Sequence, residues 1–361
     1  MAGRNQAGTG VYASNLIREL ESQDGLELEV FEGWGEGGQT VSIVGTSLRA
    51  MRRLAWTHWD FPRVLRLRQF DLLHSPSFVI PLHCPCPTVV TIHDLTYLIF
   101  PEHFNSRWRT YVSSSMPSVL KSTSAVICVS EHTKQDLLKY YDVPATKVHV
   151  VYNGVDHARF RPGIALDRRW QEIVGLREDY LLAVGSLSHR KNIPTLLRAI
   201  AHLRSVGRWG RRQLVLAGAE SPGLPGADAI HSDIRDLDLS SVTVLAGHVP
   251  DAYVPALYAN ATVLAVPSLY EGFGLTVLEG MAAGVPVVAS NASCIPEIAQ
   301  DAALLFPPGD ERALANAIQD VFDRPSLAKD LRERGLARAA HFSWQRAASE
   351  TAAIYRSVAK S

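Results

Sequence analysis

The sequence predicts an α/β protein built from two doubly wound halves of similar size. Short runs of Val, Ile and Leu alternate with longer stretches of helical periodicity, which is the pattern of buried parallel strands covered by helices. Two such series follow one another along the 361 residues, a length that fits two domains of roughly 100–200 residues each. We therefore expect two Rossmann-like domains, each with its own core.

The expected strands of both halves are short and apolar. In the first half they are Leu26–Phe31, Phe70–Ser75, Thr88–His93, Ala125–Ser130 and Val148–Asn153. In the second half they are Tyr180–Val184, Gln213–Ala217, Val242–Ala246, Ala261–Val266, Val285–Ala289 and Ala302–Phe306. Ligands bind beyond the carboxyl ends of such strands, so two facing halves predict a cleft lined by both sets of loops.

Helix and boundary signals complete this organisation. Val11–Leu20 has helical periodicity after a Gly-Thr-Gly turn, and Glu131–Tyr140 follows Ser130 as an N-cap. An Arg- and Asp-rich stretch without periodicity, Asp156–Leu176, marks the boundary. The expected domains are 1–160 and 161–341, followed by a helix over 342–361 that could cross back to the first domain.

The N-terminal half departs from the usual pattern at its start. Gly8-Thr9-Gly10 should follow a buried strand, but only seven polar or small residues precede it. The first strand, which is normally central, is therefore expected to be missing, and we interpret this as a truncated start rather than a natural variant.

Composition excludes several classes of protein. Lys+Arg and Asp+Glu both number 36, so no net field attracts nucleic acid or an anionic membrane. Four cysteines form no repeated framework, which favours a reducing, cytoplasmic compartment. Neither a signal peptide nor an apolar run of ~18 residues is present, which predicts a soluble or peripheral protein.

The strongest chemical signal lies between Pro267 and Val288, where a strand, a glycine turn and a helix follow one another. Free amides at the start of this helix would bind phosphate oxygens, and Gly272 and Gly274 allow a close approach. Glu271 and Glu279 could accept hydrogen bonds from sugar and ribose hydroxyls, which suits a nucleotide sugar. The alternative is an ordinary helix start with a capping and a solvated carboxylate.

These residues resemble glycosyltransferase family 4, whose members have the GT-B fold and retain the anomeric configuration. Glu271 and Glu279 match the Glu-x7-Glu motif of the family, including Glu-Gly-Phe-Gly-Leu and the trailing Glu-Gly-Met-Ala-Ala-Gly-Val-Pro-Val-Val. The resemblance extends over Val90–Leu95, Ile127–Glu131, Tyr152–Asp156 and Val184–Asn192, almost the whole chain.

The resemblance implies roles for the residues of this motif. Glu271 would hold hydroxyls of the transferred sugar and Glu279 the ribose, with the amides of Leu275 and Thr276 on the phosphates. The surrounding donor-binding residues would be Gly185, Gly272, Phe273 and Gly274.

A basic pair follows the strand Tyr180–Val184. Arg190 and Lys191 could stabilise the charge that grows on a leaving diphosphate. Lys191 matches the lysine of the resembling family, whereas the family's arginine often stands at the position of Ser186, so Arg190 would act as a substitute. The alternative is a pair of solvated charges at a helix start.

His93-Asp94 ends another expected strand at its carboxyl end. A single histidine there is more often structural, but the resemblance implies that His93 supports the donor sugar and phosphate. We expect His93 to be a catalytic support rather than a nucleophile. No carboxylate fits double displacement, which favours a front-face mechanism in which the leaving phosphate takes the acceptor proton.

The remaining assignments concern the acceptor and the base. The resemblance implies that Gly8, Thr9 and Gly10, with Asp94, lie on the acceptor side, and that the base is contacted through backbone atoms, for which Val249 is the candidate.

Metal binding is not expected. His83, Cys84 and Cys86 lack a fourth ligand, and no paired-aspartate motif appears.

The resemblance is greatest to mannosyltransferases of polysaccharide and O-antigen synthesis. It implies GDP-mannose rather than a UDP-sugar as donor, a glycan or lipid-linked acceptor, and neither nucleic acid nor cofactor as partner. A GT-B-type epimerase or a non-catalytic nucleotide-sugar-binding protein remains the alternative. Release of nucleoside diphosphate would separate an enzyme from a binding protein, and product identity would separate transfer from epimerisation.

Overall fold

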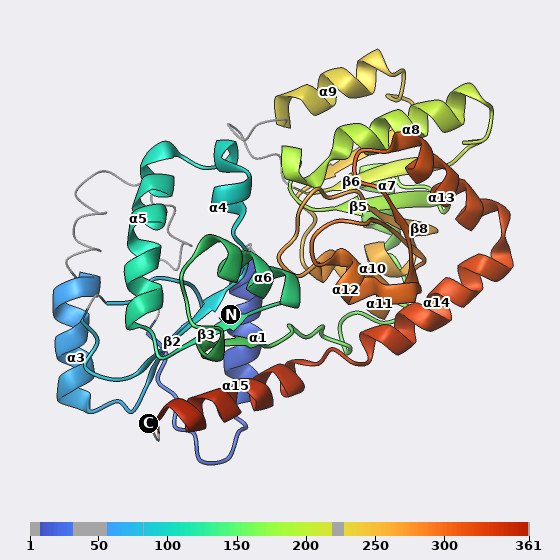
Figure 1. Ribbon diagram of the computed structural model, residues 1–361. Helices are drawn as coiled ribbons and strands as arrows, with labels where there is room; N and C mark the ends of the chain where they lie inside the picture. Colours follow the sequence, from blue (N-terminus) through green and yellow to red (C-terminus); the bar gives the residue numbers. More distant parts are fainter. Residues whose placement is uncertain (1–7, 32–55, 82, 219–226, 360–361) are drawn as a thin grey trace. The chain divides into compact units, whose positions relative to one another are not determined.

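The structure is a computed structural model that describes residues 8–31, 56–81, 83–218 and 227–359. The chain divides into two compact units, residues 1–154 with 344–361 and residues 155–343. We call these unit 1 and unit 2 and describe each by itself. Both are α/β with a parallel sheet (Figure 1).

Unit 1 contains a parallel sheet in which the strands lie in chain order, β1-β2-β3-β4. Its elements are α1 (Gly8–Leu20), η1 (Trp56–Asp60), α3 (Phe61–Arg68), β1 (Leu73–Ser75), β2 (Thr88–Ile92), α4 (Thr96–Ile99), η2 (Pro101–His103), α5 (Ser106–Ser122), β3 (Ala125–Cys128), α6 (Glu131–Tyr140), η3 (Ala145–Lys147), β4 (Val148–Val150) and α15 (Trp344–Ala359).

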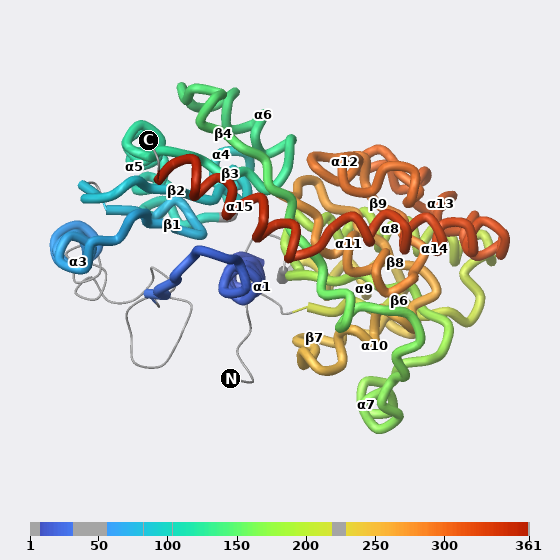
Figure 2. Tube along the Cα trace, turned by 90° about the horizontal axis from the view of Figure 1, so that it is seen from below, coloured from blue at the N-terminus to red at the C-terminus, as the bar shows by residue number. Residues whose placement is uncertain are grey.

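Alternating side chains of this sheet build two faces. Val90 and Ile92 of β2 pack into one core with Val112 and Met116 of α5. Thr91, which points the other way, bonds to Tyr12 of α1. The C-terminal helix α15 lies against α1 (Figure 2). Unit 1 is therefore a helix–sheet–helix sandwich that includes the last helix of the chain.

Unit 2 contains a six-stranded parallel sheet in the order β10-β9-β8-β5-β6-β7. Its elements are α7 (Arg168–Val174), β5 (Tyr180–Val184), η4 (His189–Lys191), α8 (Ile193–Ser205), β6 (Gln213–Ala217), α9 (Ala227–Asp236), β7 (Thr243–Gly247), α10 (Val254–Ala259), β8 (Val263–Val266), α11 (Leu275–Ala282), β9 (Val287–Ser290), α12 (Ile295–Ala299), η5 (Gln300–Ala302), β10 (Ala303–Phe306), α13 (Glu311–Asp323) and α14 (Pro325–Ala339).

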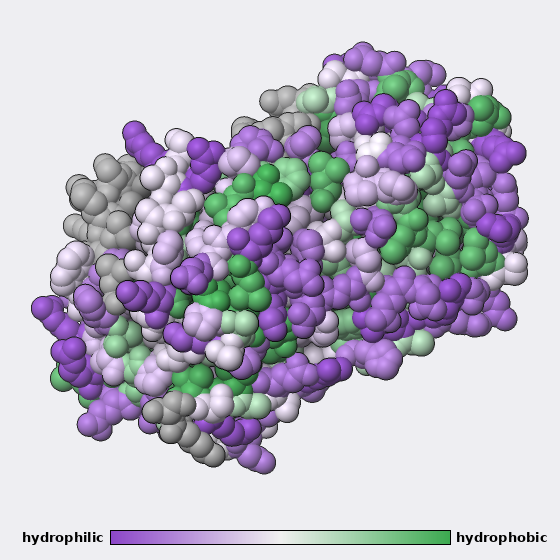
Figure 3. Space-filling view, in the orientation of Figure 1, coloured by the Kyte–Doolittle hydropathy of each residue, from purple (hydrophilic) through white to green (hydrophobic). Residues whose placement is uncertain are grey.

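This strand order is that of a doubly wound sheet. Chain order reverses between the neighbours β5 and β8, and loops that leave such a switch point in opposite directions open a ligand site. Helices α8 and α13 cover one face and α11 the other (Figure 1). Gly280 allows α11 to approach closely, because a Cβ there would lie 2.3 Å from Leu264 Cδ2. The surface over α14 is hydrophilic (Figure 3), as its exposed Lys329, Arg332 and Glu333 require.

Two expectations about the N-terminal half were wrong. Leu26–Phe31 is not a strand, since the described residues provide no ladder partner for it. Helix α1 begins at Gly8 rather than at Val11, so the expected glycine loop is its first turn. The expected absence of a first strand concerns a stretch that begins outside the described residues. Within them, β1 is an edge strand.

Candidate functional site

The loops after β5 and β8 are tied together at the switch point of unit 2. The Leu269 amide donates to the Arg190 carbonyl at 2.8 Å, and Asn192 Nδ2 donates to the Pro267 carbonyl at 3.1 Å. Asn192 adopts φ 52°, a left-handed conformation that asparagine tolerates better than most residues. These bonds bring together side chains that are 80 residues apart in the sequence.

A cluster of three charges lies between these loops. Lys191 Nζ donates to Glu271 Oε1 at 2.6 Å, and Arg190 Nη1 donates to Glu271 Oε2 at 2.9 Å. Both cations and the carboxylate are mostly buried, with 12–22% of each side chain exposed. Arg190 also donates to the Tyr270 carbonyl at 2.6 Å. The structure thus brings the three expected residues of this region into one ion-paired group, which we call the charge cluster.

The charge cluster keeps Glu271 ionised. Burial alone would raise the pKa of this carboxyl, but the charges of Lys191 and Arg190, with hydrogen bonds from Lys191 and Ser268, lower its pKa to about 2. Glu271 is therefore a carboxylate at every pH at which the protein would be assayed. It can only accept hydrogen bonds, as contact with sugar hydroxyls requires.

Two serines for which the sequence predicted no role hold Glu271 in place. Ser268 donates to Glu271 Oε1 at 2.7 Å, and the Glu271 amide donates to Ser293 Oγ at 2.8 Å. Ser293 has φ 50°, an unfavourable conformation for serine that persists where surrounding structure enforces it, often at functional sites. Ser293 follows β9 in a loop without a motif, so no sequence signal identified it.

Glycines shape the route of Lys191 and the start of α11. A Cβ at Gly185, where φ is +133°, would lie 2.8 Å from Lys191 Cε, so this position requires glycine. Gly274, with φ 85°, caps α11 without a side chain. The Leu275 and Thr276 amides that follow have no acceptor among the described residues. Two donors at the positive end of a helix are thus available to an anion.

Glu279 lies on α11 outside the charge cluster. Tyr258 Oη of α10 donates to Glu279 Oε2 at 2.9 Å. Burial raises the pKa of Glu279 to about 7, although the Tyr258 hydrogen bond and the charges of Arg159 and Lys191 oppose this shift. Glu271 and Glu279, with seven residues between them in one motif, therefore differ in protonation near neutral pH.

Two other expected donor residues are buried near these loops. The side chain of Val249, the candidate for the base contact, is only 6% exposed. Phe273 packs its ring against Phe342 with centroids 6.0 Å apart, while Gly272 precedes it as a buried residue. Their contacts with a nucleotide stay predictions.

In unit 1, His93 follows the carboxyl end of β2. Its Nε2 lies 2.9 Å from the Pro76 carbonyl, and because a carbonyl only accepts, Nε2 carries the proton. Burial lowers the pKa of His93, against the opposing effects of Pro76 and Asp94. His93 is therefore a neutral imidazole with its proton on Nε2 and its lone pair on Nδ1.

A buried hydrogen-bond network lies next to His93 and contacts it through the ring of Tyr12. The Tyr12 ring packs edge-on against His93 with centroids 4.8 Å apart, and its hydroxyl is 3.0 Å from Thr91 Oγ1. His74 Nε2 contacts the same oxygen at 2.8 Å, and His74 Nδ1 bonds to Tyr355 of α15. The network thus connects α1, β1, β2 and α15.

The residues expected on the acceptor side differ in their surroundings and hydrogen bonding. Asp94 Oδ1 accepts from the Thr96 amide at 2.9 Å, which gives it a structural role at the start of α4. Gly8 and Thr9 are exposed in the first turn of α1, and Gly10 is partly buried. Their roles toward an acceptor stay predictions.

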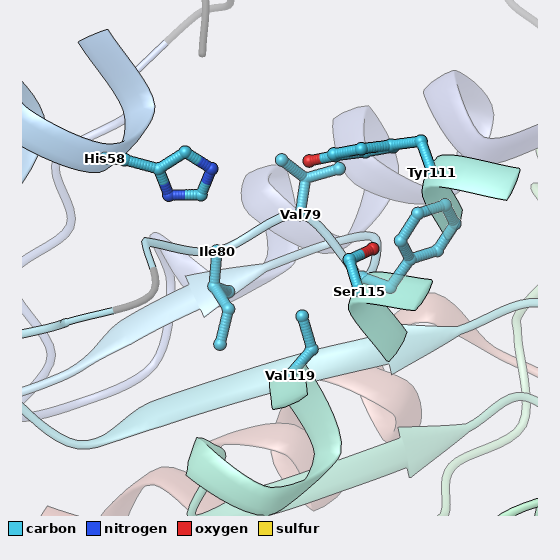
Figure 4. A pocket seen from close by; sticks show the side chains of 7 residues that line it. His58, Val79, Ile80, Tyr111, Ser115 and Val119 are labelled. Atoms are coloured by element: carbon cyan, nitrogen blue, oxygen red, sulfur yellow. The ribbon is translucent and has the colours of Figure 1, made fainter. Parts of the chain in front are cut away.

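A separate small pocket lies in unit 1, with a volume of about 90 Å³ (Figure 4). Its walls are Val79 and Ile80 after β1, Tyr111, Ser115 and Val119 on α5, and Phe78 and His58. Pockets for drug-sized ligands measure about 300–1,000 Å³, so this space is too small for a nucleotide sugar.

Within the described ranges, no group of three or more His, Cys, Asp or Glu side chains is arranged so that it could bind a metal ion. Cys84 Sγ and Cys86 Sγ lie 3.6 Å apart as free thiols. Among the helices of the same ranges, none combines the length and apolarity that crossing a membrane requires.

Solved structures confirm the two-domain fold. Sucrose-phosphate synthase from Thermosynechococcus elongatus superposes with a TM-score of 0.76 at 22% identity, covering 99% of this chain and 95% of that protein. WaaG, a glycosyltransferase involved in lipopolysaccharide biosynthesis, gives a TM-score of 0.75 at 18% identity and covers 98% and 97%.

Sequence relatives define the family. Residues 7–159 match the family Glycosyltransferase Family 4, and residues 167–338 match Glycosyl transferases group 1. The O-antigen chain mannosyltransferase B of Escherichia coli is 30% identical over 88% of this chain and 81% of its own. An MMP alpha-(1->4)-mannosyltransferase of Mycolicibacterium hassiacum is 32% identical over 86% and 74%. This chain belongs to glycosyltransferase family 4 and has the GT-B fold.

Proposed function

We propose that this enzyme transfers mannose from GDP-mannose, with retention of configuration, to a hydroxyl of a glycan or lipid-linked acceptor in polysaccharide or O-antigen synthesis. The charge cluster at the switch point of unit 2 is the observation that carries the proposal, because it combines cations for a diphosphate with a carboxylate for a sugar. Mannose is favoured because the relatives from Escherichia coli and Mycolicibacterium hassiacum are mannosyltransferases.

Different residues of unit 2 bind the diphosphate and the sugar of the donor. The amides of Leu275 and Thr276 and the Lys191 ammonium bind the diphosphate, while Glu271 accepts from sugar hydroxyls. When the bond between the anomeric carbon and the phosphate oxygen breaks, its electron pair leaves with the diphosphate. The positive charges of Lys191 and Arg190 stabilise the growing negative charge on the diphosphate. This stabilisation is larger in the transition state than in the bound ground state, so it accelerates the reaction.

The acceptor attacks from the face that the diphosphate leaves. Its hydroxyl oxygen bonds to the anomeric carbon, and its proton moves to a diphosphate oxygen, so no enzyme nucleophile is needed. His93 of unit 1, a neutral imidazole with its lone pair on Nδ1, supports the developing positive charge of the sugar electrostatically. The reaction is placed in the cytoplasm, with peripheral membrane contact where the acceptor is lipid-linked.

A thermal-shift panel with GDP, UDP, ADP and TDP tests the choice of donor. A ligand at ~100 times its dissociation constant adds about 2.7 kcal/mol to the apparent stability. We expect GDP to raise the melting temperature most and GDP-mannose to be consumed with release of GDP. A larger shift with UDP, together with transfer from a UDP-sugar, would replace the donor but leave the transferase assignment intact.

Removal of divalent metal ions is expected to leave transfer unchanged, because Lys191, Arg190 and the helix amides handle the leaving diphosphate. Initial rates should agree within experimental error in EDTA and in added magnesium or manganese. An enzyme that EDTA silences and manganese restores would show that this metal-free mechanism is wrong.

A further inference from the structure

Helix α10 provides a hydroxyl to the second glutamate of the Glu-x7-Glu motif. Tyr258 of α10 is fully buried, and its Oη donates to Glu279 Oε2 at 2.9 Å. Its ring meets Phe160 edge-on with centroids 5.6 Å apart. Figure 1 shows α10 beside α11, the helix that carries Glu279. Packing therefore fixes the tyrosine, and the tyrosine fixes one carboxylate oxygen.

The charges around this pair favour a carboxylate. Arg159 and Lys191 stabilise the ionised form of Glu279, whereas Asp251 disfavours it. Burial raises the pKa of Tyr258 well above its usual range, with Glu279 adding to the effect and Thr276 and Arg159 opposing it. Tyr258 thus remains a donor throughout the neutral range, and Glu279 is the group that changes protonation there.

We propose that Tyr258 is a positioning residue of the donor site, whose hydroxyl orients the Glu279 carboxyl group so that Oε1 faces the donor ribose. The proposal rests on the proposed function, in which Glu279 binds that ribose. Oε1 has no partner among the described residues, so the arrangement leaves one acceptor available.

Donor affinity should consequently depend on pH. At pH values below the Glu279 pKa of about 7, the carboxyl group is protonated, and either Oε1 or Oε2 carries a proton and becomes a donor rather than an acceptor. The kcat/KM for the donor, which reports the free enzyme, should therefore rise with pH and level off above about 7. The Tyr258 hydrogen bond lowers the pKa of Glu279, so its loss should move this midpoint to higher pH.

Tyr258→Phe tests this role while keeping the buried ring. At pH 7 we expect the donor KM to rise roughly tenfold, the order expected for a hydrogen bond to a charged group, with kcat changed less than about twofold. The midpoint of kcat/KM against pH should move upward. Calorimetric titration with GDP, without an acceptor, should show the same loss of affinity and the same pH shift.

Tyr180→Phe is the matched control. Tyr180 is also fully buried in unit 2, and its hydroxyl donates to the Leu257 carbonyl at 2.6 Å rather than to the carboxylate. We expect this control to lower the melting temperature and to leave the KM and the pH midpoint unchanged. If Tyr258→Phe behaves like Tyr180→Phe, the tyrosine is only structural and the inference is wrong.

Glu279→Gln separates this inference from the proposed function. We expect it to weaken donor binding and to abolish the pH dependence around 7. A Glu279→Gln enzyme with the wild-type donor KM would overturn the ribose role itself. Weakened binding in Glu279→Gln with an unchanged Tyr258→Phe enzyme would overturn only the inference about Tyr258.

Discussion

Lys191→Ala is expected to lower the turnover of sugar transfer by about 10²–10³-fold, the usual cost of removing a group that stabilises transition-state charge. Its ammonium, 2.6 Å from Glu271 Oε1, is the cation that Gly185 leaves room for. The effect should appear in kcat at saturating donor, because the diphosphate gains charge only as the glycosidic bond breaks.

Lys329→Ala provides a control for lysine removal. Lys329 forms an exposed ion pair with Glu333 on α14, and such surface pairs contribute about 0–1 kcal/mol. We expect wild-type turnover and melting temperature for this variant. Turnover of Lys191→Ala within a few-fold of wild type, measured on protein with an unchanged circular dichroism spectrum, would exclude Lys191 from the catalytic group.

Glu271→Ala is expected to reduce transfer by a similar factor of about 10²–10³. The substitution removes the acceptor proposed for the sugar hydroxyls and also the counter-ion that holds Lys191 and Arg190. Glu271→Gln keeps the shape but loses the charge, so it should retain more activity than Glu271→Ala. Progress curves at saturating donor, with circular dichroism to monitor folding, measure both effects.

The matched control for Glu271 is Glu311→Ala, which removes a partly exposed carboxylate that pairs with Arg198 at the start of α13. It should leave kcat and the donor KM unchanged. If Glu271→Ala transfers sugar as fast as this control, Glu271 has no part in holding the sugar.

The fold of unit 2 could be predicted from the sequence in detail. The expected strands Tyr180–Val184 and Gln213–Ala217 have the bounds of β5 and β6, because each is a continuous apolar run between polar turns. The same holds for one helix of unit 1, where Glu131–Tyr140 is α6 and Ser130 accepts from the Thr133 amide as its N-cap. In these segments the local pattern and the tertiary environment favour the same structure.

The expectations for the N-terminal residues were less accurate for a physical reason. Leu26–Phe31 alternates apolar and charged residues like a half-buried strand, but a strand exists only where another strand pairs with it. Gly8 and Gly10 lie inside a helix although glycine is a poor helix former, which tertiary packing of Tyr12, Leu16 and Leu20 overrides.

The site residues were named from the motif, but most of their contacts were not. Arg190 and Lys191 were expected to serve the phosphates, whereas the structure also pairs both with Glu271. That pairing depends on β5 lying beside β8, a neighbour relation that a single sequence does not contain. For the same reason Tyr258 and Ser293, which have no motif of their own, could not be identified.

The central claim is that the charge cluster binds the diphosphate of the donor. Calorimetric titration of the enzyme with a nucleoside diphosphate and with the matching monophosphate tests it most directly. Both nucleotides carry the base that stabilises the enzyme most in the thermal-shift panel. The account predicts that the wild-type enzyme binds the diphosphate at least about tenfold more tightly, and that Lys191→Ala removes most of this preference while leaving monophosphate affinity unchanged. Equal preference for the diphosphate in the wild type and Lys191→Ala would contradict it.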